Sequence, residues 1–150
     1  MSDIAPHRTV PGPPPPGTLA GVDEAMIETV VRAFYGKIRA DEVLGPIFSA
    51  VIADWEPHLR KMCDFWSSIL LMTKRYEGRP VPPHLKIEGL DRPHFERWLR
   101  LFDETTRDIC PPAAAELFID RAGRVAQSLL LAIDFQRGVL PPLKAPIRAG

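Results

Sequence analysis

The chain has 150 residues, of which 45% are apolar and 25% charged, and its 19 basic and 19 acidic side chains give no net charge. These values are typical of one soluble globular domain and argue against a general nucleic-acid-binding protein or an electrostatic membrane-surface protein. The longest apolar runs, ILLM and LLLAI, are too short to cross a bilayer.

Two further features concern the compartment. The N-terminus lacks the basic start and apolar stretch of a secretory signal, and the two cysteines, Cys63 and Cys110, cannot form a disulfide framework. We therefore expect a reduced, cytoplasmic protein with neither nucleic acid nor membrane as a partner.

Proline is concentrated near the N-terminus, where six of the 17 prolines fall within the first 17 residues. Such a segment favours polyproline II and cannot bury a core. We predict a disordered proline-rich tail over residues 1–20, a folded domain over 21–139 and a flexible C-terminal tail over 140–150.

The first two helices of the folded part are predicted from their apolar stripes. The first helix follows Asp23, a plausible N-cap, and its stripe comprises Ile27, Val30, Val31, Phe34, Tyr35 and Ile38. A short helical piece, LGPIFSAVI, comes next. The second helix begins near Asp54 with Pro57 in its first turn, and its stripe comprises Trp55, Leu59, Met62, Trp66, Ile69 and Leu70.

The following segment, TKRYEGRPVPPHLKIEGLD, has no long period. Its Pro82–Pro83 pair favours the start of a short helix, which Gly89 would end. A third helix is predicted from near Asp91, and a last one from about Ala113 to Gln136. No segment shows the alternation of a strand, so we predict an all-α fold.

Three histidines, His58, His84 and His94, lie in the folded part. A single histidine is more often structural than a ligand. The sequence has no H-E-x-x-H motif, no Cys/His cluster and no nucleophile motif, so zinc, di-iron and side-chain catalysis have little support.

Four polar side chains nevertheless fall on apolar stripes or beside them. His58 shares a helix face with Met62 and Phe65. Tyr35 and Trp98 lie within apolar stripes, where their O–H and N–H groups need partners. Together with His84, these groups fit a flat iron cofactor with one axial histidine and a polar cavity opposite it.

At these positions the sequence resembles the truncated haemoglobins of group III. The likeness rests on AFYGKIRADEVLGPIF, WEPHLRKMCDFWSSILL, GRPVPPHLKIEGL and HFERWLRLFDETTRD. It implies a two-over-two helical sandwich around haem b. By position, His84 matches the proximal iron ligand, and the polar distal residues correspond to Tyr35, His58 and Trp98. Positions that line or back the haem pocket correspond to Met62, Phe65 and Trp66.

The resemblance implies a haem protein for oxygen binding or transport, with dioxygen, nitric oxide or carbon monoxide as ligands. Tyr35 and Trp98 are the candidate hydrogen-bond donors to such a ligand. Nitric oxide dioxygenase or peroxidase-like chemistry at the same site would need a reductase that the sequence does not identify.

Some alternatives stay open at this point. His94 competes with His84 as the iron ligand, and His58 either ligates the iron or gates the pocket. Arg75 and Arg79 either pair with haem propionates or are solvated surface charges.

A different class of function is also compatible with the sequence. The chain would then be a cofactor-free helical interaction module whose tail, PGPPPPG, docks on an aromatic groove of a partner. In that case the aromatic side chains would form only a core, and His84 would be a loop residue.

Overall fold

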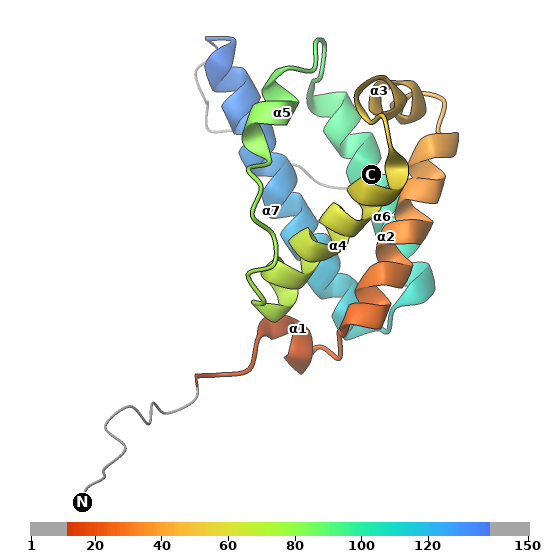
Figure 1. Ribbon diagram of the computed structural model, residues 1–150, viewed down its shortest axis with the longest axis vertical. Coiled ribbons are helices and arrows are strands. Elements are labelled where there is room, and N and C mark those ends of the chain that lie inside the picture. The colour runs from red at the N-terminus through yellow and green to blue at the C-terminus, as the bar shows by residue number, and fades with distance from the viewer. Residues whose placement is uncertain (1–11, 139–150) are drawn as a thin grey trace, which may run out of the picture.

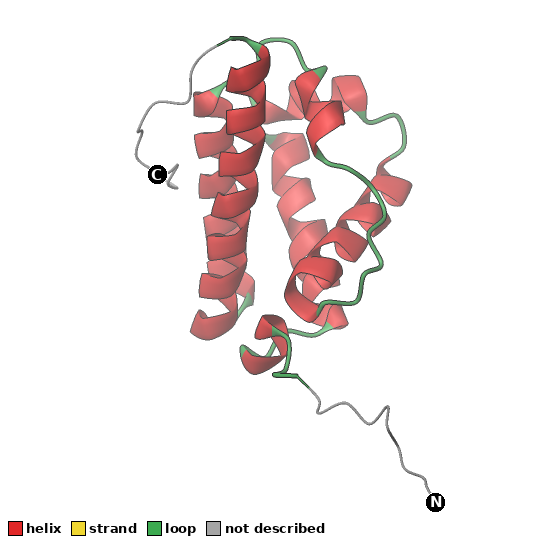
Figure 2. Cartoon of the chain, turned by 90° about the vertical axis from the view of Figure 1, so that its left-hand side faces the viewer, coloured by secondary structure: helices red, strands yellow, loops and turns green. Residues whose placement is uncertain are grey.

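The computed structural model describes residues 12–138 as a set of helices joined by loops (Figures 1 and 2). The helices are α1 (Pro16–Leu19), α2 (Glu24–Ala40), α3 (Leu44–Val51), α4 (Trp55–Leu71), α5 (Val81–Leu85), α6 (Arg92–Ile109) and α7 (Pro112–Gln136). No strand occurs within residues 12–138, which confirms the all-α prediction. Over the same range, no helix has both the length and the apolar character needed to cross a membrane.

The four long helices form two packed pairs. Helix α2 packs against α4, α6 packs against α7, and α2 also contacts α6, so that the pairs lie one over the other (Figure 1). The short α5 lies beside α7. This is the two-over-two arrangement that the resemblance implied.

The predicted apolar stripes form the core where the two pairs meet. All six stripe residues of α2 are buried. The largest fully buried side chains are Phe34 on α2, Phe102 on α6 and Phe118 on α7. Burial of a side chain of this size contributes about 1.5–3 kcal/mol. These three rings therefore fix how α2, α6 and α7 sit against one another.

Several helix ends follow the predicted signals. The Asp23 carboxylate accepts a hydrogen bond of 2.8 Å from the backbone N–H of Met26 at the start of α2. Gly138, just beyond the end of α7, has a φ angle of 76°, a left-handed conformation that favours glycine after a helix. In contrast, α5 ends at Leu85, before the predicted stop at Gly89. Asp54 is the N-cap of α4, but its side chain makes no capping hydrogen bond there.

Helix α1 lies within the segment that was predicted to be a disordered tail. Its Gly17 is buried, and a Cβ atom at this position would lie 2.6 Å from the carbonyl oxygen of Leu70 near the end of α4. Only glycine allows this close approach. The predicted boundary at residue 21 therefore falls too late, whereas residues 1–11 and 139–150, which hold most of the two predicted tails, lie outside the described residues.

An ion pair ties the corner between α2 and α3 to α6. The Asp41 carboxylate accepts hydrogen bonds from Arg97 Nε at 2.8 Å and Arg97 Nη2 at 2.9 Å. It also accepts from the backbone N–H groups of Val43 and Leu44 at 3.1 and 2.9 Å. The Arg97 guanidinium and these N–H groups hold the pKa of Asp41 at about 2, below its ordinary value of 3.8.

We expect Asp41→Asn to lower the free energy of unfolding by about 1–2 kcal/mol at pH 7, because the ion pair with Arg97 becomes a hydrogen bond to a neutral amide. Folding lowers the pKa of Asp41, so the contribution is complete above about pH 4 and is lost as the pH falls towards 2. Urea unfolding at pH 7 and at pH 2 measures the difference in the free energy of unfolding between the wild type and Asp41→Asn. The exposed i,i+4 pair of Asp103 and Arg107 provides a control, since Asp103→Asn should change stability by no more than about 0.5 kcal/mol. A deficit of Asp41→Asn that persists at pH 2 would contradict this assignment.

Candidate functional site

A cluster of aromatic rings brings Tyr35 of α2 next to His58 of α4. The two ring centroids are 5.3 Å apart and the ring planes are perpendicular. Trp55, one turn before His58, contacts both rings at 6.0 and 5.9 Å. Burial raises the pKa of Tyr35 well above its usual range. The phenol therefore stays protonated and keeps its hydrogen-bond donor.

His58 carries an unsatisfied polar atom. Its Nε2 is buried and has no hydrogen-bond partner among the described residues. Burial, followed by the nearby charges of Lys61 and His84, lowers the pKa of His58. The imidazole is therefore neutral at pH 7. A buried, unpaired nitrogen of this kind points to a missing partner at the site.

His84 lies on α5 and is held by the backbone of its own helix. Its Nδ1 is 2.5 Å from the carbonyl oxygen of Pro80. Because a carbonyl can only accept, Nδ1 carries the proton and donates it, and Nε2 keeps a free lone pair. Metal-binding histidines commonly have this hydrogen bond, which fixes the tautomer and the ring orientation.

The other predicted pocket residues lie on α4 and α6. Met62 and Phe65 of α4 and Trp98 of α6 are half-buried. Phe34 contacts both Tyr35 and Trp98, at 5.0 and 5.5 Å between ring centroids, and so links the two candidate donors. Further half-buried apolar side chains of these helices and of the segment after α5 are Ile69, Leu85, Ile87 and Leu101. Incompletely buried apolar surface around a few polar groups is typical of a site for a flat apolar ligand.

Trp66, which was predicted to line or back the pocket, belongs to the core. It is 4% exposed, and its ring stacks on Phe102 with centroids 5.2 Å apart and an angle of 13° between the planes. It therefore packs α4 against α6 in the core.

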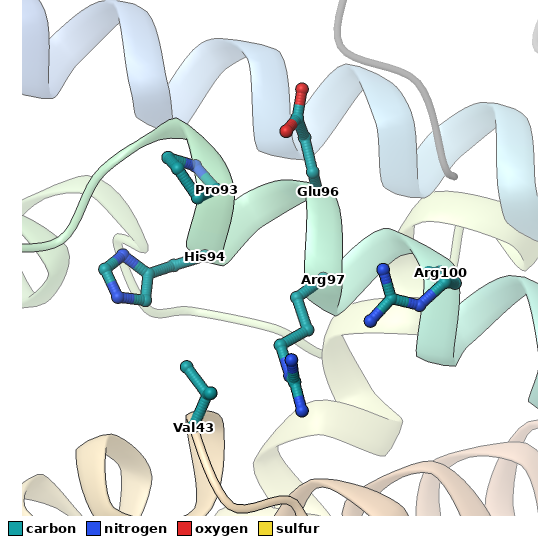
Figure 3. Close-up of a pocket in the computed structure, with 6 residues that line it drawn as sticks. All are labelled: Val43, Pro93, His94, Glu96, Arg97 and Arg100. Carbon is teal, nitrogen blue, oxygen red and sulfur yellow. The ribbon is translucent and has the colours of Figure 1, made fainter.

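The competing histidine, His94, has a different role. Its Nδ1 accepts a hydrogen bond of 3.1 Å from the backbone N–H of Asp91 and so closes a capping box at the start of α6. Figure 3 shows His94 beside a surface hollow of about 370 Å³, which Arg97, Arg100 and Val43 also line. His94 thus stabilises the start of α6 and lies beside charged side chains, unlike His84.

The connection between α4 and α5, residues 72–80, is a long loop held by side chains (Figure 2). The fully buried Ser67 bonds to Glu24 and to Thr73 at 2.8 Å each. The Tyr76 N–H donates to the Ser68 hydroxyl at 2.8 Å. These bonds fix the segment that leads to His84.

Two arginines of this loop were candidates for haem propionates. Arg75 is 3.1 Å from Glu24, which favours its interpretation as a surface ion pair. Arg79 is exposed and has no ion-pair partner within residues 12–138. Sequence reasoning did not single out Trp55, Tyr76 or the Pro80 carbonyl, because their roles come from contacts between elements.

Comparison with known proteins identifies the family. No protein-family model matches the sequence. The chain is 31% identical over 109 residues to the group 3 truncated haemoglobin of Campylobacter jejuni, an alignment that covers 70% of this chain and 86% of the relative. The chain belongs to the group III truncated haemoglobins.

Solved structures agree with this assignment. The group III truncated haemoglobin of C. jejuni matches this truncated haemoglobin with a TM-score of 0.70 and 29% identity, over 75% of this chain and 91% of the other. A mutant of the group II truncated haemoglobin from Bacillus anthracis has the same fold, with a TM-score of 0.67 and 24% identity over 81% and 93% of the two chains.

Membership in this family makes the protein a globin-type haem protein that binds small ligands such as dioxygen. Two features of this truncated haemoglobin fit a haem. His84 has a free Nε2 lone pair in a fixed tautomer, and His58 has a buried nitrogen without a partner. The family therefore favours the haem prediction over the cofactor-free interaction module.

Proposed function

We propose that this truncated haemoglobin binds haem b through His84 and holds dioxygen, nitric oxide or carbon monoxide beside Tyr35, His58 and Trp98. The hydrogen bond from His84 Nδ1 to the Pro80 carbonyl carries this proposal, because it leaves Nε2 as the one nitrogen able to coordinate a metal. A bound haem iron with one protein ligand supplies an open coordination position for a diatomic ligand.

Residues of α5 and α4 would orient and shield the cofactor. Pro82 and Pro83 lie in the first turn of α5 and restrict the backbone that carries His84. The half-buried Met62 and Phe65 offer apolar contact to a flat ring and exclude water from it. In this role α5 holds His84 on a short backbone of restricted conformation, and α4 lines one side of the haem site.

The distal residues would retain the ligand by hydrogen bonding. Tyr35 keeps its phenolic proton because burial raises its pKa. His58 is neutral and has a buried nitrogen free for the ligand. A hydrogen bond to a group that carries charge contributes about 1.5–3 kcal/mol. Two such bonds, from the candidate donors Tyr35 and Trp98, would favour slow release, which suits reaction with nitric oxide or peroxide better than oxygen delivery.

Reactions of this kind need electrons from a separate reductase, which we propose as a protein partner. The two cysteines are free, with Cys63 half-buried and Cys110 buried. Free thiols support the cytoplasmic location that we propose, because reducing compartments keep cysteines unpaired.

Titration of the purified protein with haem tests the proposal. We expect a Soret band that saturates at one haem per chain and shifts when carbon monoxide is added to the reduced protein. A protein that shows no Soret band after haem is supplied would overturn the proposal.

A further inference from the structure

An unbroken array of aromatic rings runs from the candidate distal site to the loop between α4 and α5. Trp98 stacks on Phe102 at 5.7 Å between centroids, with 3° between the planes. Phe102 stacks on Trp66 at 5.2 Å. Trp66 meets Phe65 edge-on at 5.6 Å, and Phe65 meets Tyr76 edge-on at 5.1 Å. Every ring of the array therefore contacts the next one.

The array alternates rings that can be oxidised with rings that resist oxidation. Trp98, Trp66 and Tyr76 can each lose one electron at a moderate potential, whereas phenylalanine resists oxidation. A single phenylalanine ring separates Trp98 from Trp66, and another separates Trp66 from Tyr76. An electron thus crosses only one inert ring at each step.

The ends of the array are more accessible than its middle. Trp66 and Phe102 are buried in the core, at 4% and 1% exposure, whereas Tyr76 is half-buried in the loop. An oxidised tyrosine gives up its phenolic proton as well as an electron, so it needs access to a proton acceptor. At Tyr76 the solvent can serve as that acceptor.

The surroundings of Tyr76 hold the ring and carry positive charge. The Ser68 hydroxyl accepts a hydrogen bond from the Tyr76 N–H. A Cβ atom at Gly78 would lie 2.7 Å from Tyr76 Oη, so the phenol packs closely against the backbone of this glycine. Lys74 and Arg79 are exposed in the same loop together with one acidic residue, Glu77, so the balance of these three charges is positive. Their charges favour the approach of anions.

We propose that this array carries oxidising equivalents to Tyr76, where a small anionic one-electron donor is oxidised at the expense of hydrogen peroxide. The inference rests on the haem site proposed above, beside which Trp98 would lie. Hydrogen peroxide takes up two electrons and two protons and becomes two water molecules. For each electron, Tyr76 loses one electron through the array and its proton to water. The donor then returns the electron and water returns the proton, so that two donor molecules are oxidised per peroxide.

Radical spectroscopy tests the proposal, since the chain contains only two tyrosines. The haem-loaded protein is mixed with one equivalent of hydrogen peroxide, frozen rapidly and examined by electron paramagnetic resonance. We expect a tyrosyl radical signal that is lost in Tyr76→Phe. Trp66→Phe preserves a packed ring but interrupts the relay, and should remove the tyrosyl signal. Phe135→Leu, at an exposed ring outside the array, should keep it.

A donor assay provides the second measurement, with ferrocyanide as the anionic probe. Tyr76→Phe should lose most peroxide-dependent ferrocyanide oxidation while it keeps the wild-type haem spectrum and carbon monoxide binding. A tyrosyl signal that survives in Tyr76→Phe, or ferrocyanide oxidation at the wild-type rate, would overturn this inference alone. A protein that takes up no haem would overturn the proposed function, and this inference with it.

Discussion

Replacement of His84 by glycine is expected to abolish coordination by the proximal histidine and to lower haem affinity by more than about 100-fold. Loss of a partner that merely orients a metal ligand lowers affinity by about 10–100-fold, and loss of the ligand itself should exceed this. The fold should survive, because no residue of α5 is buried. The absorption spectrum during haem titration measures both the affinity and the coordination state.

Free imidazole makes this experiment specific. It should enter the space left by the side chain and restore the coordination of the iron in His84→Gly. His94→Gln is the matched control, since its amide oxygen can still accept the hydrogen bond from Asp91 N–H. This control should bind haem as the wild type does. A His84→Gly protein with unchanged coordination would refute His84 as the ligand, and loss of coordination in His94→Gln would point to His94 instead.

The second large effect is expected from Tyr35→Phe, which should accelerate dioxygen dissociation by at least about fivefold. Loss of a hydrogen bond worth about 1.5–3 kcal/mol corresponds to roughly one to two powers of ten in the dissociation constant. Phenylalanine keeps the ring that packs against His58 and Trp55, so the substitution removes the hydroxyl with little change in packing. Displacement of dioxygen by carbon monoxide, followed by stopped-flow absorption, gives the rate.

The same substitution at the other tyrosine provides the control. Tyr76 lies in the loop beyond Phe65, so Tyr76→Phe should leave dioxygen dissociation unchanged. If Tyr35→Phe released dioxygen at the wild-type rate, the phenol would have no part in holding the ligand, and His58 and Trp98 would remain as the donors.

Local chemistry made the helices predictable from the sequence. The stripe of α2 has the helical period, and its start at Asp23 and the end of α7 at Gln136 lie where the sequence signals put them, whereas α5 ends at Leu85, before Gly89. Helix α1 was missed because it has only four residues, and because proline-rich sequence resembles a tail until the contact of Gly17 with Leu70 is seen.

The parts of the site that the sequence did not reveal depend on contacts between distant residues. Arg97 and Asp41 are 56 positions apart, and Ser67 and Glu24 are 43 apart. Periodicity says nothing about such pairs. His94 could not be separated from His84 by composition or spacing alone, since the distinguishing fact is which backbone group each imidazole binds.

The absence of buried residues in α5 has a thermodynamic consequence. Core packing secures this helix only through the partly buried Val81 and Leu85. Its local folding and the binding of haem at His84 would therefore form one coupled equilibrium. Each proline at a compatible position lowers the entropy of the unordered chain and contributes about 0.4–1 kcal/mol. Pro82 and Pro83 would thus strengthen haem binding without touching the cofactor, because the chain loses less conformational entropy when His84 binds the iron. On this basis, the stiffness of α5 would add to the haem affinity that the contacts of the pocket provide.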